Sequence, residues 1–142
     1  MIEHLDLLLS APYVQKLGVR FDDHGDELTG TLPYHEDLVG NPLIPALHGG
    51  AIGAFMEITA SAALLAATDL VALPKPIDVS VDYLRPGKPL DVYARGTITR
   101  QGSRVANVRV EAWQERRGAP VAALHGHFLI KPAGDRQALT PK

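Results

Sequence analysis

A nearly continuous apolar stretch, "GGAIGAFMEITASAALLAATDL" at residues 49–70, constrains the fold of this 142-residue chain more than any other feature. Residues three and four apart share one face of a helix, and this stretch is apolar on nearly every face. A helix of that kind needs burial on several sides, so the rest of the chain has to surround it. It also carries one carboxylate near its middle, Glu57, whose presence needs a reason.

A membrane span is the main alternative for this stretch, because residues 51–73 are long enough to cross a bilayer. Glu57 and Asp69 would each cost about 2.5 to 3.5 kcal/mol near the middle of a membrane. No lysine or arginine lies within the stretch or closely before it to anchor it at a membrane surface. We therefore expect a helix buried in protein and no membrane partner.

The segments around the helix predict strands. Residues 17–34, "LGVRFDDHGDELTGTLPY", have the alternating pattern of two short strands around the turn-prone "DDHGD". After Pro76 the pattern alternates again, and turns at Gly87, Gly102 and Gly118 separate four successive strands, which we expect to form an antiparallel meander. Residues 35–47, with two prolines and a glycine, predict a loop.

These elements, with a short amphipathic helix at residues 2–10, predict an α+β fold. The economical arrangement is a curved antiparallel sheet wrapped around one long central helix. We expect a single domain over residues 1–142, with its core at about 12–131 and a frayed polar tail at 133–142.

Composition excludes several classes of function. The net charge of −2 gives no electrostatic attraction to nucleic acid, so no nucleic-acid partner is expected. The absence of cysteine excludes disulfides, thiolate metal sites and cysteine nucleophiles. No lysine-led apolar leader opens the sequence, which favours a cytoplasmic location.

One face of the predicted central helix carries only small or polar residues. We call this face the small stripe; it consists of Gly50, Gly53, Ala54, Glu57, Ala60 and Ser61. The stripe leaves either room for a ligand beside Glu57 or a surface on which another helix packs closely. Because a buried carboxylate without a partner is costly, and perturbed carboxylates cluster at functional sites, Glu57 is a candidate base or nucleophile.

The residues before the stripe, His48, Gly49 and Gly50, supply a second chemical element. Amide groups at a helix start lack intrahelical partners and favour negative charge, which outlines an oxyanion site. The helical rise from Gly50 to Glu57 is roughly 10 Å, a gap that an acyl group could bridge, with the carboxylate and the amides from different chains. For His48 a local capping role is favoured over proton transfer, and for Ser61 a bond to its own i−4 carbonyl is favoured over catalysis.

The segment "LHGGAIGAFMEITASAAL" resembles the central helix of hotdog-fold acyl-CoA thioesterases of the phenylacetic-acid-degradation type. Members of that family carry His-Gly-Gly and then an Asp or Glu eight residues after the first glycine, which is the spacing from Gly49 to Glu57. Ser61 matches a Ser or Thr that some members place four residues after the acid. The likeness covers roughly residues 12–131 and implies a single hotdog domain.

The resemblance implies a mechanism and an assembly. The amides of Gly49 and Gly50 would polarise the thioester carbonyl, while Glu57 would act as nucleophile or activate water; no cofactor is implied, since CoA enters with the substrate. Many members place an Asn or Gln six residues before the histidine. Asn41 stands seven before His48, so a one-residue bulge would be needed. The family forms homodimers or dimers of dimers with each site between chains.

The resemblance also indicates residues that could bind the coenzyme and the acyl group. Arg85 and Arg104 are near loops that flank the cleft in similar proteins and are candidates for the CoA phosphates, although arginines beside turns are often only solvated. Phe55, Met56 and Tyr83 are candidates for the acyl pocket, whose chain-length preference stays open.

Other functions of hotdog proteins give further expectations. R-specific enoyl-CoA hydratases resemble "D-x-N-P-L-H", but here Val39 and Ile44 replace the acid and the histidine. Acyl-carrier-protein dehydratases carry a histidine about fourteen residues before the helix Glu, where this chain has Leu43. A non-catalytic acyl-CoA binding or sensing protein remains an alternative, and the retained Glu57 argues against it.

The paired histidines of the last predicted strand, His125 and His127, raise the question of a metal site. No acidic cluster is visible near them in the sequence, so local packing on the strand is favoured over metal binding. We expect no metal in this protein.

Overall fold

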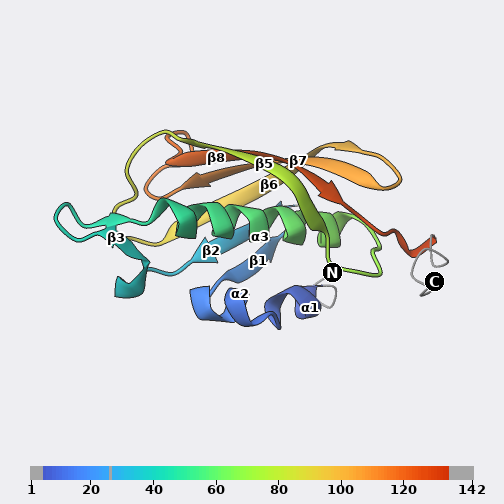
Figure 1. Ribbon diagram of the computed structural model, residues 1–142, viewed down its shortest axis with the longest axis horizontal. Helices are drawn as coiled ribbons and strands as arrows, with labels where there is room; N and C mark the ends of the chain where they lie inside the picture. Colours follow the sequence, from blue (N-terminus) through green and yellow to red (C-terminus); the bar gives the residue numbers. More distant parts are fainter. Residues whose placement is uncertain (1–4, 26, 135–142) are drawn as a thin grey trace.

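The computed structural model describes residues 5–25 and 27–134. Its centre is helix α3 (Gly49–Ala67), around which an antiparallel sheet curves (Figure 1). Phe55 and Met56 of this helix have no exposed surface and belong to the main hydrophobic core. In the described residues, α3 alone is long and apolar enough to cross a membrane, and 56% of its most apolar window is buried inside the protein.

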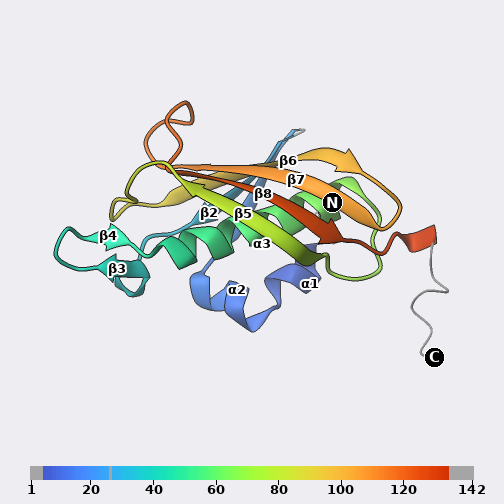
Figure 2. The ribbon, with the colours of Figure 1, turned by 45° about the horizontal axis from the view of Figure 1, so that its top comes forward.

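The sheet has six strands in the order β1-β2-β6-β7-β8-β5, and every neighbouring pair is antiparallel. Their bounds are Arg20–His24 (β1), Glu27–Leu32 (β2), Lys75–Tyr83 (β5), Val92–Gln101 (β6), Val105–Trp113 (β7) and Ala122–Leu129 (β8). Figure 1 shows β5 and β8 above α3 and β1 and β2 below it, and Figure 2 shows β6, β7, β8 and β5 side by side along one side of the helix. The predicted α+β architecture, a curved sheet around one central helix, is confirmed.

The prediction of a four-strand meander is wrong for β5. Strands β6, β7 and β8 pair consecutively, but β5 pairs with β8, from Lys75 opposite Leu129 to Tyr83 opposite Ala122. Gly87 is therefore not the turn of a hairpin. A Cβ at this glycine would lie 3.0 Å from Ile52 of α3, so the glycine allows a crossing segment to pass close to the central helix.

The N-terminal region contains two short helices, α1 (Asp6–Leu9) and α2 (Pro12–Leu17), where the sequence predicted one helix ending before Pro12. Proline at the first helical position starts α2, because the missing amide hydrogen has no intrahelical acceptor there anyway. Gly18 ends α2 in the left-handed conformation, with φ +78°. Residues 2–4 of the predicted helix and residues 135–142 of the predicted tail lie outside the described residues.

The predicted loop at 35–47 contains regular structure. It begins with the 3-10 helix η2 (Glu36–Leu38) and continues as a small two-stranded sheet of β3 (Val39–Asn41) and β4 (Ala46–Leu47). Two backbone hydrogen bonds connect its end to neighbouring segments: His48 N–H donates to Leu38 O at 2.7 Å, and Leu47 N–H donates to Gly87 O at 3.0 Å. The start of α3 is therefore held in a defined position.

Candidate active site

His48 caps the start of α3 with its side chain. The backbone of His48 is extended, and its Nδ1 accepts a hydrogen bond from Gly50 N–H at 2.8 Å. This bond requires a ring without a proton on Nδ1. Gly40 of β3 makes the arrangement possible, because a Cβ at that position would lie 2.8 Å from His48 Cα.

The two glycine amides of the predicted oxyanion site differ in their hydrogen bonding. Gly50 N–H is engaged by His48, whereas Gly49 N–H makes no hydrogen bond with any residue in the part of the chain that the structure describes. A carbonyl oxygen could accept from Gly49 N–H directly, but it would reach Gly50 N–H only after displacing the imidazole. The site therefore has one accessible donor and one that His48 covers.

Tyr83, at the end of β5, contacts the same turn of α3. Its hydroxyl donates a hydrogen bond to Gly49 O at 2.7 Å. A Cβ on Gly49 would lie 3.1 Å from the tyrosine ring, and one on Gly53 would lie 3.2 Å from its hydroxyl oxygen. Tyr83 thus covers the part of the small stripe around Gly53. The sequence indicated Tyr83 only as a candidate for the acyl pocket.

Glu57 lies half-buried on the small stripe, two helical turns after Gly50. Among residues 5–25 and 27–134, none forms a hydrogen bond or an ion pair with its carboxylate. The rise between the two positions is about 10 Å, so one chain does not bring the carboxylate to its own helix start. The arrangement leaves a carboxylate that is free to act on a bound molecule.

Ser61 follows Glu57 by one turn and is buried. Its hydroxyl makes no hydrogen bond with a described residue, so the expected bond to its own i−4 carbonyl is absent. Thr59 makes that kind of bond instead, to Phe55 O at 2.9 Å. Ser61 therefore keeps its hydroxyl available one turn from the carboxylate.

Asn41 lies at the end of β3, next to a one-residue bulge in the pairing of β3 with β4. A bulge of this kind was expected from the seven-residue spacing between Asn41 and His48. Val39 pairs with Leu47 and Asn41 pairs with Ala46, so β3 has one extra residue relative to β4. The side chain of Asn41 is exposed, and its Oδ1 accepts from Leu43 N–H at 3.1 Å. In this conformation the Asn41 side chain bonds to the loop between β3 and β4 and, among the described residues, makes no hydrogen bond to the start of α3.

Two cavities flank the start of α3. One, of about 400 Å³, lies between α2, η2 and α3 and is lined by Tyr13, Lys16, His35, His48 and Gly50. The other, of about 340 Å³, lies between β4, α3 and the end of β5 and is lined by Leu47, Gly49, Ile52, Tyr83 and Arg85. Both glycines of the predicted oxyanion site thus border space that a ligand could enter.

The two arginines predicted to bind CoA lie at opposite ends of α3. Arg85 lines the cavity beside Gly49 and a neighbouring cavity with Lys88 and Arg116. Arg104 lies in the β6–β7 turn, where Gln101 Nε2 donates to Thr68 at the C-terminal end of α3. Because α3 is about 28 Å long, one chain does not bring Arg104 to the helix start.

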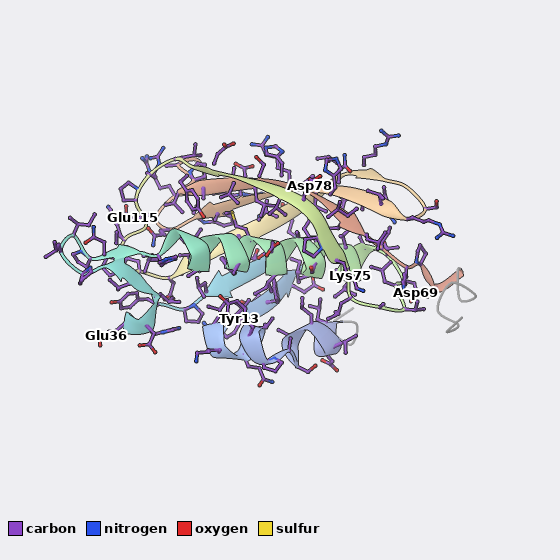
Figure 3. All side chains as sticks on the ribbon, in the orientation of Figure 1. Tyr13, Glu36, Asp69, Lys75, Asp78 and Glu115 are labelled. Atoms are coloured by element: carbon purple, nitrogen blue, oxygen red, sulfur yellow. The ribbon has the colours of Figure 1, made fainter. Side chains whose placement is uncertain are left out.

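The histidines of β8 both lie on the exposed face of the strand. His127 Nδ1 lies 2.7 Å from Oδ1 of Asp78 on β5, an acidic partner that the sequence did not indicate. In Figure 3, Asp78 lies on the side of α3 opposite Tyr13, which lines the larger cavity at the helix start. The described ranges contain no group of three side chains that could hold a metal ion.

Comparison with known proteins adds independent findings. Residues 45–121 match the model of the family described as the thioesterase superfamily. The Escherichia coli medium/long-chain acyl-CoA thioesterase YigI is 27% identical over 118 residues, which cover 73% of this chain and 76% of that protein.

Solved structures match over most of their length. A Chromobacterium violaceum protein is 40% identical, covering 92% of this chain and 90% of that one, with a TM-score of 0.72. A Pseudomonas aeruginosa protein is 31% identical, covering 89% and 96%, with a TM-score of 0.77. A phenylacetic acid degradation-related protein from Ralstonia eutropha shares the fold at 21% identity, covering 89% and 98%, with a TM-score of 0.75.

Proposed function

Because this chain belongs to the thioesterase superfamily and is a hotdog-fold thioester hydrolase, we propose that it hydrolyses acyl-CoA thioesters to a free acid and CoA. The observation that carries the proposal is Glu57, a half-buried carboxylate that no described residue neutralises, on the helix that starts with His48-Gly49-Gly50. The name of the E. coli relative supports acyl-CoA as the substrate class. Both the acid and the polarising amides come from the chain, so the reaction needs no cofactor.

The helix start stabilises the charge that develops during the reaction. The thioester oxygen accepts hydrogen bonds from the amides of Gly49 and Gly50, the latter after His48 has moved away. Negative charge grows on this oxygen as the carbonyl carbon becomes tetrahedral, and both the amides and the helix dipole favour that charge. The glycines leave the backbone open to close approach by the substrate.

Glu57 performs the covalent or the proton-transfer step. As a nucleophile, its carboxylate adds to the carbonyl carbon and expels the CoA thiolate, and water then cleaves the resulting anhydride. As a general base, it takes a proton from water while the hydroxide adds to the carbon and the thiolate leaves. Ser61 would orient the carboxylate or the water, and Asn41 would assist only after its side chain leaves Leu43.

The active protein is a homodimer or a dimer of dimers, with each site between chains. Strand β5 supports this proposal, because it forms an edge of the sheet and exposes Ile77 (55%) and Val79 (39%). An edge strand of nine residues leaves backbone N–H and C=O groups free to pair with another chain. Association would let Glu57 of one chain serve the amides of another, which the separation of about 10 Å within one helix prevents.

Arg85 is the candidate for the phosphates of CoA on the same chain as the amides, because it borders the cavity beside Gly49. Arg104, at the far end of α3, can serve only a site to which a second chain contributes. Non-catalytic acyl-CoA binding and enoyl-CoA hydration are the competing functions.

The test is release of free thiol from a panel of aryl, short-chain and long-chain acyl-CoAs. We expect hydrolysis of at least one class by the wild-type protein and its loss in Glu57→Ala. Wild-type rates no higher than those of the variant would overturn the proposal in favour of binding alone. Addition of water to an enoyl-CoA without thiol release would instead identify a hydratase.

A further inference from the structure

One peptide group at the start of α3 is held at both of its ends. The carbonyl of Gly49 and the N–H of Gly50 belong to the same planar unit. The hydroxyl of Tyr83 donates to that carbonyl at 2.7 Å, and His48 Nδ1 accepts from that N–H at 2.8 Å. The orientation of this peptide is therefore determined by side chains from β5 and from the residue before the helix.

We propose that Tyr83 is a positioning residue that orients the Gly50 N–H toward the thioester oxygen; this inference rests on the proposed function. When the substrate carbonyl replaces His48 on that N–H, the peptide loses the hydrogen bond that it donates to His48. The bond from Tyr83 to the other end of the peptide stays in place. Oxyanion donors act through being held in position before the reaction, and Tyr83 supplies that support.

The composition of the first turns of α3 explains why such support is needed. Gly49, Gly50 and Gly53 leave space for ligand and tyrosine, but each glycine costs about 1 kcal/mol of helix stability relative to alanine. The segment that has to present a fixed donor is thus intrinsically the least rigid part of the helix. Tyr83 packs over Gly49 and Gly53 and restores order there.

The hydroxyl also strengthens the donor. A hydrogen bond to a peptide carbonyl polarises the peptide, so the N–H at its other end becomes a better donor. Tyr83 is 55% exposed and is not part of the core, so its main contribution is this bond and the packing over the two glycines.

The test compares Tyr83→Phe with the wild-type protein on an acyl-CoA that it hydrolyses. The phenylalanine keeps the ring over the glycines and removes only the hydrogen bond to Gly49 O. We expect kcat to fall about tenfold, less than the hundredfold or more lost when an oxyanion donor is removed, with KM nearly unchanged. The amide proton of Gly50 should also shift upfield in the NMR spectrum without substrate.

Tyr93→Phe is the matched control, because Tyr93 lies on β6 beside Trp113, with ring centroids 6.2 Å apart. It should leave kcat and the Gly50 amide signal unchanged. A second variant, Gly53→Ala, puts a methyl 3.2 Å from the Tyr83 hydroxyl oxygen while raising helix propensity. We expect it to lower kcat without lowering stability, and to have no further effect when Tyr83 is already phenylalanine.

Failure of this inference differs from failure of the proposed function. Wild-type kcat in Tyr83→Phe, together with loss of activity in Glu57→Ala, would overturn the role of Tyr83 and leave the thioesterase mechanism intact. A fall in kcat that matches a loss of folded protein, with an unchanged Gly50 amide signal, would also overturn it. No thiol release by the wild-type protein from any acyl-CoA would overturn both.

Discussion

The two halves of α3 are both rich in apolar residues but differ in composition and in structural role. The first half, residues 49–57, contains three glycines and the partly exposed Glu57. Its helix start is held by the hydrogen bond that Gly50 N–H donates to His48 and by the one that Tyr83 donates to Gly49 O. The second half, residues 58–67, has no glycine and is mostly buried. We expect the chemistry to depend mainly on the first half and substitutions in the buried second half to act mainly on stability.

The largest expected effect is that of Glu57→Gln on activity. The amide keeps the shape of the side chain but can neither attack the thioester nor take a proton, so kcat should fall about a thousandfold. Stability should stay within about 0.5 kcal/mol, because the carboxylate has no described partner to lose. Thiol release and urea unfolding measure the two quantities. A large loss of stability with activity retained would contradict this expectation.

In the second half of the helix, Leu64→Ala should have the opposite profile. Leu64 has no exposed surface, so removing its side chain should cost about 2 to 5 kcal/mol of unfolding free energy through a cavity in the core. The protein that remains folded should keep the wild-type kcat. Leu43→Ala is the matched control, because Leu43 is 91% exposed and its loss should leave stability nearly unchanged.

His48→Ala tests whether His48 acts only as a helix cap that stabilises α3 or also takes part in catalysis. Loss of the capping bond to Gly50 N–H should cost about 1 kcal/mol of stability, the usual effect of replacing a helix cap by alanine. It should also free Gly50 N–H for the substrate carbonyl, so KM should not rise. His125→Ala, an exposed histidine on β8, is the control. A fall in kcat comparable to that of Glu57→Gln would instead make His48 a catalytic residue.

The sequence predicted well the features that depend on neighbouring residues. The central helix, the hairpin of β1 and β2 and the three strands β6, β7 and β8 follow from periodicity and turn residues within short windows. Gly49, Gly50 and Glu57 were found by their spacing on one helix. The roles of these three residues remain predictions.

The features that the sequence did not predict depend on residues far apart in the chain. Gly87 has the character of a turn residue, but its role is to let a crossing segment approach α3. The bond from Tyr83 to Gly49 joins residues 34 positions apart, and no local pattern carries it. Two glycines one turn apart, Gly49 and Gly53, were the available signal that a large side chain lies over the helix.

The smallest expected effect distinguishes a site built from one chain from a site built between chains. Arg85 borders the cavity beside Gly49, while Arg104 lies near the other end of α3, about 28 Å away by helical rise. If CoA phosphates contact Arg85 alone, Arg85→Ala should raise KM about threefold to tenfold and Arg104→Ala should not change it.

A rise of KM in both arginine variants would require a second chain, because one chain cannot bring both arginines to one CoA molecule. In that case Ile77→Asp, which puts a charge on the exposed edge strand β5, should abolish association in light scattering and activity together. If the protein stays active as a monomer, Glu57 and the amides of Gly49 and Gly50 do not act on the same carbonyl group, because about 10 Å of helical rise separates them within one chain. The arginine pair therefore decides how the two halves of α3 cooperate: within one molecule or across an interface.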